Sequence, residues 1–466
     1  MSAHLFRGML AAAVLAAAAA LPAAAQTDPA VPFTFTVREI TAPPGTPKMQ
    51  SFALGRSGND WVLIGGRRNG FHRTSTREST FPTSTANDSI YVVDMAAGRT
   101  YSAPLPAQFR SILRVSNTQY VQDGSFLYVV GGYGSTCDND EPSCYQTYPN
   151  LTIITLPSLV YFVKRQEFGG IGGVISTRAD ERMRVTGGAL EKIGDTFYLV
   201  MGHNYNSIYK GGVTGIYTEQ VRTFTLPAPY SPEIRDYLAY GDPSGSGPNS
   251  QWHRRDLNVV TTVQPGGIHG LAIYGGVFTP TSGAWVNPMY MTVPPGGGTP
   301  VFALDTAFSM RMSQYECAHV VMYDPGTETM YTTLLGGISG WYYDANGTLV
   351  PGGINNSLPW TGTITTLARA ADGSTREVVQ PAGQGLPGRR GANAAFVPDE
   401  ARTMVAGTHE VIDYSQLPPG DSVRVGWMYG GIFATADQSS EFDPTFASDK
   451  IYEVWLHRRP ALPRRE

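Results

Sequence analysis

A short apolar strand that ends in two glycines recurs along the chain and constrains the fold more than any other feature. Five copies carry the full doublet, and a sixth, Tyr-Leu-Val-Met201-Gly202, lacks the first glycine. The doublets are Gly65-Gly66, Gly131-Gly132, Gly275-Gly276, Gly336-Gly337 and Gly430-Gly431. Glycine has no Cβ, so such pairs let backbones approach closely. Self-similarity at this scale predicts one repeat architecture in place of several unrelated domains.

Further strand signals flank each copy. Turn pairs such as Asp123-Gly124 and Gly194-Asp195 separate the doublet strand from a preceding apolar run, which indicates a hairpin. A third strand follows each doublet, at 90–94, 151–156, 220–226, 289–293, 361–367 and 451–456. Four antiparallel strands per unit predict an all-β, six-bladed β-propeller, or a seven-bladed one if the insertion around 401–422 hides a degenerate unit. The alternating run Phe33–Val37 has no hairpin partner, so we expect it to close the ring beside Ile451–Leu456.

The doublets, together with the segments Ile-Tyr-Val-Val-Asp94 and Ile-Tyr-Glu-Val-Trp455, resemble the Kelch family of propellers. The resemblance covers residues 26–459 and implies a single propeller domain there, although the Tyr/Trp spacing of the Kelch consensus is poorly kept. Several polysaccharide lyases are propellers, and sialate epimerases are exported Kelch propellers, so the resemblance implies carbohydrate chemistry. Galactose oxidase is also a Kelch propeller, but nothing here matches its copper ligands.

The chain termini carry separate signals. Arg7, an apolar run over 9–21 and the small residues Ala23–Ala25 predict a signal peptide over 1–25, and hence a periplasmic or secreted protein. No later run approaches the roughly 20 apolar residues of a spanning helix, so no membrane insertion is expected. Residues 460–466 form a basic C-terminal tail.

Composition excludes several classes. Only 15% of residues are charged, while 53 are Gly and 34 are Pro, which disfavours helical bundles and coiled coils. The net charge of -4 gives no long-range attraction for a polyanion, so we expect no nucleic-acid partner.

Cysteine placement agrees with export. Cys137 and Cys144 lie in one polar stretch, and we expect them to form a local disulfide bond. Cys317 lies on an apolar strand segment and is expected to be a small buried side chain.

Function is expected in the long connections that follow the doublets, which all emerge on one face: 67–89, 133–149, 203–217, 277–285, 338–358 and 432–448. Arginines can bind carboxylates through two nitrogens, and aromatic rings can stack on sugars. The predicted substrate-binding residues are Arg68, His72, Arg184, Arg255, Arg390 and Trp341. We therefore expect a glycan, an acidic one above all, at the channel mouth.

The candidate catalytic residues are His319, Tyr315, His203 and Tyr205. Elimination next to a carboxylate needs a base, an acid and a cation, and Tyr315 and His319 lie in a run with Arg311 and Glu316 that contains all three. An acidic polysaccharide lyase or a sugar isomerase is one interpretation. The alternative is a non-catalytic binding or assembly module for a protein or glycan, with the arginines paired to nearby Asp and Glu. Metal-binding motifs are absent from the sequence, so we expect no metal or other cofactor, and we expect a monomer.

Overall fold

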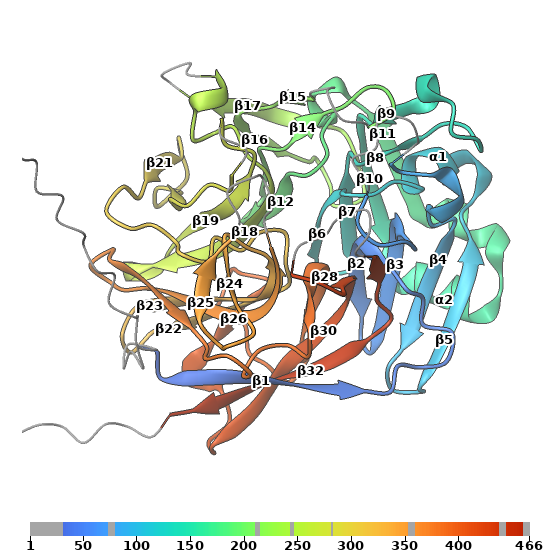
Figure 1. Ribbon diagram of the computed structural model, residues 1–466. Helices are drawn as coiled ribbons and strands as arrows, with labels where there is room; N and C mark the ends of the chain where they lie inside the picture. Colours follow the sequence, from blue (N-terminus) through green and yellow to red (C-terminus); the bar gives the residue numbers. More distant parts are fainter. Residues whose placement is uncertain are drawn as a thin grey trace, which may run out of the picture.

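The computed structural model describes residues 31–72, 80–209, 215–242, 247–280, 283–352, 359–437 and 444–459. Six antiparallel sheets stand in a ring around a common axis (Figure 1). The predicted all-β propeller with six four-stranded blades is confirmed. The predicted signal peptide, 1–25, and basic tail, 460–466, lie outside the described residues.

Each blade runs from an inner strand at the axis to an outer strand at the rim. Blade 1 consists of β2 (Gln50–Ser57), β3 (Asp60–Arg67), β4 (Ser89–Asp94) and β5 (Arg99–Pro104). Blade 2 consists of β6 (Gln119–Asp123), β7 (Phe126–Val130), β10 (Asn150–Thr155) and β11 (Ile175–Ala179). Blade 3 consists of β12 (Ala189–Ile193), β13 (Thr196–Val200), β16 (Gln220–Thr225) and β17 (Arg235–Gly241).

The second half of the ring follows the same order. Blade 4 consists of β18 (Arg255–Gln264), β19 (Ile268–Val277), β20 (Met289–Thr292) and β21 (Val301–Leu304). Blade 5 consists of β22 (His319–Asp324), β23 (Thr329–Ile338), β26 (Trp360–Arg369) and β27 (Thr375–Val379). Blade 6 consists of β28 (Arg389–Pro398), β30 (Ser422–Ala434), β32 (Ile451–Arg458) and the N-terminal β1 (Phe33–Ile40).

The N-terminal strand closes the ring as predicted. β1 pairs with β32 in antiparallel register from Phe33↔Arg458 to Ile40↔Ile451, so the last blade joins the two ends of the described chain (Figure 1). Phe33 and Phe35 are each only 1% exposed, because they pack into the core shared by blades 5 and 6. This contact ties the first strand to the last unit through side chains as well as backbone.

The insertion around 401–422 does not form a seventh blade. Its one strand, β29 (Val411–Asp413), pairs in parallel with the inner strand β22 of blade 5. The segment 399–421 therefore turns toward the axis and leaves the blade number at six.

The doublets dock neighbouring blades. In three of the doublets the second glycine donates its N–H to a carbonyl of the next blade: Gly66 to Val115 at 2.7 Å, Gly132 to Val185 at 2.8 Å and Gly431 to Met49 at 2.9 Å. Both glycines of each pair have positive φ, and a Cβ on Gly131 would collide with the Val185 carbonyl. In the sixth copy Met201 adopts the same left-handed conformation, with φ 49°, and Gly202 donates to the next blade.

Smaller elements decorate this frame. Short hairpins follow the doublets in β8 (Tyr133–Ser135) with β9 (Tyr145–Thr147), β14 (His203–Asn204) with β15 (Ile216–Tyr217), and β24 (Trp341–Tyr343) with β25 (Leu349–Pro351), while β31 (Thr445–Ala447) pairs with β30. Helix α1 (Arg110–Leu113) is a single turn.

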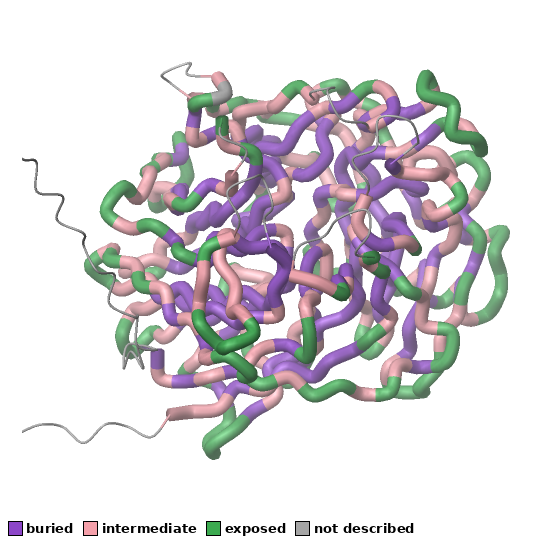
Figure 2. The backbone as a smooth tube through the Cα atoms, viewed as in Figure 1, coloured by how far each residue is buried: buried purple, intermediate pink, exposed green. Residues whose placement is uncertain are grey.

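Helix α2 (Leu156–Arg165), which the strand repeats do not predict, buries Leu156, Leu159, Val160 and Val163. This spacing forms one apolar face, which packs against β2, β4 and β5 of blade 1. Figure 2 shows that buried residues concentrate in the blades and around the axis, whereas exposed residues lie at the loops and the rim.

The predicted disulfide bond between Cys137 and Cys144 is present, and Cys317 is buried and unpaired. Within the described ranges, no helix has the length and apolar character needed to cross a membrane.

Candidate functional site

A ring of six residues surrounds the axis where the chain turns into each inner strand. Every one has a positive φ between 46° and 64°, although only one is glycine. The members, one from each blade, are Ser51, Asn117, Gly187, Asp256, Glu316 and Asn393. We call this set the axial ring. A left-handed conformation at non-glycine residues is costly, so its repetition shows that the surrounding fold imposes it.

Backbone hydrogen bonds connect most of the axial ring. Asn117 donates its N–H to the Ser51 carbonyl at 3.2 Å, Gly187 donates to Asn117 at 3.2 Å, and Asp256 donates to Gly187 at 2.7 Å. Asn393 donates to the Glu316 carbonyl at 2.6 Å. The ring lies between a cavity on the doublet face and a second cavity farther along the axis, since four of its residues line both: Ser51, Asn117, Glu316 and Asn393.

The doublet-face cavity has a volume of about 520 Å³. Eight aromatic residues from several blades contribute to its walls: Phe71, Phe81, Tyr133, Tyr205, Tyr209, Phe278, Tyr315 and Trp360. Ligand sites combine walls of this kind with a few oriented polar groups. Here the polar groups include two arginines, two histidines and five of the six axial-ring residues.

The connection after the first doublet reaches across the mouth of this cavity. The Phe71 ring meets Trp360 of blade 5 edge-on at 5.3 Å, and the His72 ring meets Tyr209 of blade 3 at 4.9 Å. The Phe71 N–H also donates to Thr445 Oγ1 in blade 6 at 2.7 Å. One blade therefore supplies part of the cavity's cover and fixes it to three others.

Arg255 and His203 hold each other in place. Arg255 Nη1 donates to His203 Nε2 at 2.8 Å, so the other histidine nitrogen carries the proton that Nδ1 donates to the Thr186 carbonyl at 3.1 Å. Burial, and then the charge of Arg255, hold the pKa of His203 well below its usual range. His203 is thus neutral with both nitrogens engaged. Arg255 also donates to the Tyr209 hydroxyl at 2.9 Å.

Two carboxyl groups of the axial ring lie beside Arg255. Burial raises the pKa of Glu316 well above its ordinary value, the nearby Asp256 raises it further, and Arg255 only partly opposes this. With the amide of Asn393 oriented to satisfy both groups, it donates to Glu316 Oε1 at 2.7 Å and accepts from Ser51 Oγ at 2.8 Å. Burial also raises the pKa of Asp256, so the single cation Arg255 does not offset the burial of both carboxyl groups.

Arg67 carries a charge that the described residues do not neutralise with an ion pair. It is 4% exposed and donates to Asn69 Oδ1 at 3.0 Å and to Thr85 Oγ1 at 2.7 Å, while its guanidinium stacks over Phe81. Burial lowers the pKa of Arg67 to about 10. Asp140 interacts with Arg67 through charge but forms no ion pair with it, so the hydrogen bonds of this buried cation go to neutral groups, which favours an anionic ligand group.

The structure brings five of the ten predicted site residues to this cavity: His72, His203, Tyr205, Arg255 and Tyr315. Burial raises the pKa of Tyr315 well above its ordinary value, so this phenol keeps its proton and suits a donor role better than a base role.

The other five predicted residues do not line this cavity, because each is held elsewhere. Arg68 donates to Asn87 and Tyr91 on blade 1, and Arg184 binds both oxygens of Glu181 at 2.7 Å. Arg390 bonds the Tyr452 hydroxyl within blade 6, and Trp341 stacks with Arg311. His319 lies beyond the axial ring, 3.7 Å from Glu410. The expected single cluster of Tyr315, His319 and the arginines is therefore not formed.

Several lining residues were not among the predicted site residues. Asp256 immediately follows the predicted Arg255, and Arg67 immediately precedes the predicted Arg68. Their position at the start of an inner strand, or directly after a doublet, is the sequence signal that would have identified them.

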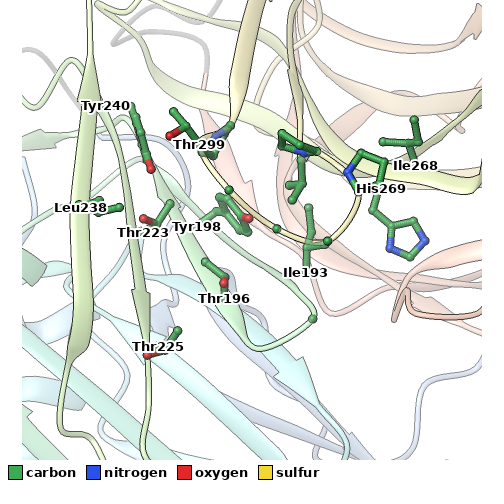
Figure 3. A pocket seen from close by; sticks show the side chains of 18 of the residues that line it. Ile193, Thr196, Tyr198, Thr223, Thr225, Leu238, Tyr240, Ile268, His269 and Thr299 are labelled. Atoms are coloured by element: carbon green, nitrogen blue, oxygen red, sulfur yellow. The ribbon is translucent and has the colours of Figure 1, made fainter.

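A groove of about 730 Å³ opens between blades 3 and 4 on the opposite face (Figure 3). Threonine and tyrosine side chains of blade 3 face residues 293–300 and His269 of blade 4 there, and the lining includes no arginine or lysine. The groove is larger than the doublet-face cavity, but it lacks the cations that an acidic ligand requires. In the described part of the chain, no group of His, Cys, Asp and Glu has a metal-binding arrangement.

Comparison with known proteins assigns no family: no family model matches the chain, and no curated protein matches it significantly.

Proposed function

We propose that this protein is a Kelch-like propeller that binds an acidic saccharide unit in the doublet-face cavity. The observation that carries the proposal is the buried guanidinium of Arg67 in an aromatic-walled cavity of about 520 Å³. Aromatic rings stack on the apolar faces of sugars, and a buried arginine that is hydrogen-bonded only to neutral groups attracts an acidic substituent.

We further propose that Glu316 and Asp256 perform acid–base chemistry on the bound unit, with Tyr315 as a proton donor. A buried protonated carboxyl can protonate a leaving oxygen, and an ionised one can remove a proton next to the sugar carboxylate. Arg67 and Arg255 would stabilise the negative charge that develops there. These roles correspond to elimination, as in a polysaccharide lyase.

A non-catalytic binding module is the second candidate, and one observation favours it. The candidate catalytic residue His203 has both ring nitrogens engaged, by Thr186 and Arg255, so it offers no free acceptor to a substrate. Binding and turnover therefore have to be measured separately.

The test compares uronate oligosaccharides with the same oligosaccharides methyl-esterified, which keeps the rings and removes the charge. In isothermal titration calorimetry, the charged oligosaccharide should bind at least tenfold more tightly than the ester. Arg67→Met should remove this preference, whereas Arg68→Met, which changes the adjacent arginine outside the cavity, should retain it.

Turnover is followed by ultraviolet absorbance of unsaturated products. Product formation that Glu316→Gln abolishes, with binding retained, supports the lyase. Charge-selective binding without product supports the module. Equal affinity for acid and ester, or equal behaviour of the two arginine variants, would overturn the proposal.

A further inference from the structure

The insertion 399–421 is the one long connection between an inner strand and its neighbour. In the other five blades these two strands are joined by turns of two to four residues, all within the described chain. Long connections in compact domains are usually functional. This one enters the channel, because β29 adds to the axial edge of β22 and Glu410 Oε1 accepts the N–H of Thr261 in blade 4 at 2.6 Å.

The insertion builds one wall of a second cavity, the axial chamber, of about 590 Å³. All six inner strands contribute the remaining wall, so the chamber lies on the axis beyond the axial ring. The insertion supplies Asp399, Arg402, Met404, His409 and Glu410 to its lining. Four of the eight Asp, Glu, His and Arg side chains in the lining therefore belong to this single segment.

Two of the chamber's four carboxyl groups, those of Glu191 and Glu410, have a histidine partner, whereas Asp399 pairs with Arg424 at 2.9 Å and Glu316 belongs to the axial ring. His409 Nε2 lies 3.4 Å from Glu191 Oε2, and His319 Nε2 lies 3.7 Å from Glu410 Oε2. Thr261 Oγ1 also donates to Glu191 Oε2 at 3.3 Å. When the histidines are protonated, these pairs cancel their own charges and leave the chamber's arginines as its net charge.

Arg402 is the group that the chamber leaves unsatisfied. Its Nε and Nη1 are buried and have no hydrogen-bond partner among the described residues. The other arginine of the lining, Arg56, donates to the Pro398 carbonyl and lies 3.9 Å from Glu400. Burying donors of a charged group without acceptors is expensive, so an arginine with two unpartnered nitrogens in the wall of a cavity favours an anionic ligand there.

We propose that the axial chamber binds a small organic carboxylate, with Arg402 as its ionic partner and the histidines of the two pairs as further donors. A cavity of this volume lies in the range of small-molecule sites. Phe52, Leu54, Val397 and Met404 provide apolar lining for a short carbon skeleton. This site is separate from the doublet-face cavity, and the proposal does not rest on the saccharide proposal above.

Binding to this site should strengthen as the pH falls from about 8 to about 6. Burial, and then the nearby Glu410, raise the pKa of Glu191 to about 7, so this carboxylate loses its charge over that interval. Burial alone would lower the pKa of His409, but contact with Glu191 outweighs it, and the pKa is raised. Both changes make the chamber more positive at pH 6.

The same reasoning covers the other groups that face these residues. His319 behaves like His409, since its contact with Glu410 raises its pKa. Burial raises the pKa of Tyr120 to about 12, so it stays neutral. The other acids near these residues are Asp123, which interacts with His409, Asp399, which pairs with Arg424, and Glu316 of the axial ring.

The test titrates the full chain with succinate and acetate by isothermal titration calorimetry at pH 6 and pH 8. Succinate should bind at least tenfold more weakly to Arg402→Met than to the wild type, and Arg402→Lys should lie between them. Arg178→Met changes an exposed arginine on β11 and should bind like the wild type, and so should Arg67→Met.

Circular dichroism establishes that each variant is folded. If Arg402→Met does not fold, the succinate affinity of Arg402→Lys and the pH dependence of succinate binding to the wild type still test the proposal. Wild-type affinity in both Arg402 variants would show an adventitious ion only and overturn the proposal, as would weaker binding at pH 6 than at pH 8. Loss of succinate binding in Arg67→Met would place the ligand in the other cavity and also overturn it.

Discussion

Gly131→Ala tests whether the doublets hold the blades together. Gly131 has φ 64° and packs against the carbonyl of Val185 in the next blade, where an added Cβ would collide. Gly132 beside it donates to that same carbonyl at 2.8 Å. The substitution should therefore strain both the backbone conformation and the contact between blades 2 and 3.

Gly124→Ala separates these two effects. Gly124 lies in the β6–β7 turn of the same blade with φ 55°, and nothing lies within 4 Å of a Cβ placed there. Its cost is the left-handed conformation alone, about 1 to 2 kcal/mol per residue. About 0.4 to 1 kcal/mol of this is offset because alanine restricts the unfolded chain. The expected loss for Gly124→Ala is thus about 1 kcal/mol.

Gly131→Ala adds the blade contact to this cost. Forcing an extra carbon into a packed site costs about 1 to 3 kcal/mol. If the blades move apart to relieve it, the buried Val185 carbonyl loses its donor, at about 1 to 3 kcal/mol. Because moving the blades apart relieves part of the overpacking, the two costs do not add in full. The expected total loss of unfolding free energy for Gly131→Ala is about 3 to 4 kcal/mol.

Urea unfolding of the two variants measures the difference directly, because the midpoint and the slope together give the free energy of unfolding. Gly131→Ala should lose at least about 2 kcal/mol more than Gly124→Ala. Equal losses in the two variants would refute the interpretation that the doublet locks neighbouring blades.

Two further substitutions test the axial ring and the ring closure. Burial, and then the charge of Asp256, raise the pKa of Glu316 in the folded protein. At about pH 8 this glutamate ionises freely only in the unfolded chain, which favours unfolding. Glu316→Gln removes this effect, so it should stabilise the protein at about pH 8, and the gain should vanish near pH 4. Urea unfolding at both pH values checks this, and a gain that persists at pH 4 would contradict it. Phe35→Ala should cost about 3 to 5 kcal/mol by opening the core at β1, whereas exposed Thr36→Ala should cost less than about 1. Similar losses in their thermal unfolding would show that β1 closes the ring through backbone pairing alone.

The sequence predicts the blades well, because hairpin turns and strand alternation are local signals. The third strand expected at 220–226 is observed as Gln220–Thr225, and the pairing of β1 with β32 follows from an alternating run without a hairpin partner. The seventh-blade alternative was wrong because 401–422 contains only one short strand, which attaches to an existing blade.

The site was predicted less well, because the direction of a strand side chain depends on register. In β28 the register shifts between Arg390 and Ala392, and a one-residue shift moves side chains to the other face. Arg390 accordingly bonds Tyr452 within its own blade and does not line the channel cavity. Nothing local in the sequence marks such a shift, so residues that look equivalent in the repeat need not share a cavity.

The position of a residue relative to the axial ring indicates which cavity its side chain lines. Arg255 and Tyr315 directly precede ring residues and line the doublet-face cavity, whereas His319 lies three residues after Glu316 and lines the axial chamber. The residues three after the other ring members line that chamber too: Leu54, Tyr120, Leu190, Val259 and Phe396. Arg184 precedes Gly187 by three positions and reaches neither cavity. The number of residues between a side chain and the ring residue of its blade, and not the number of the repeat, therefore determines which side chains share a cavity. By this measure Arg255 and Tyr315 belong together, and His319 belongs to the other cavity.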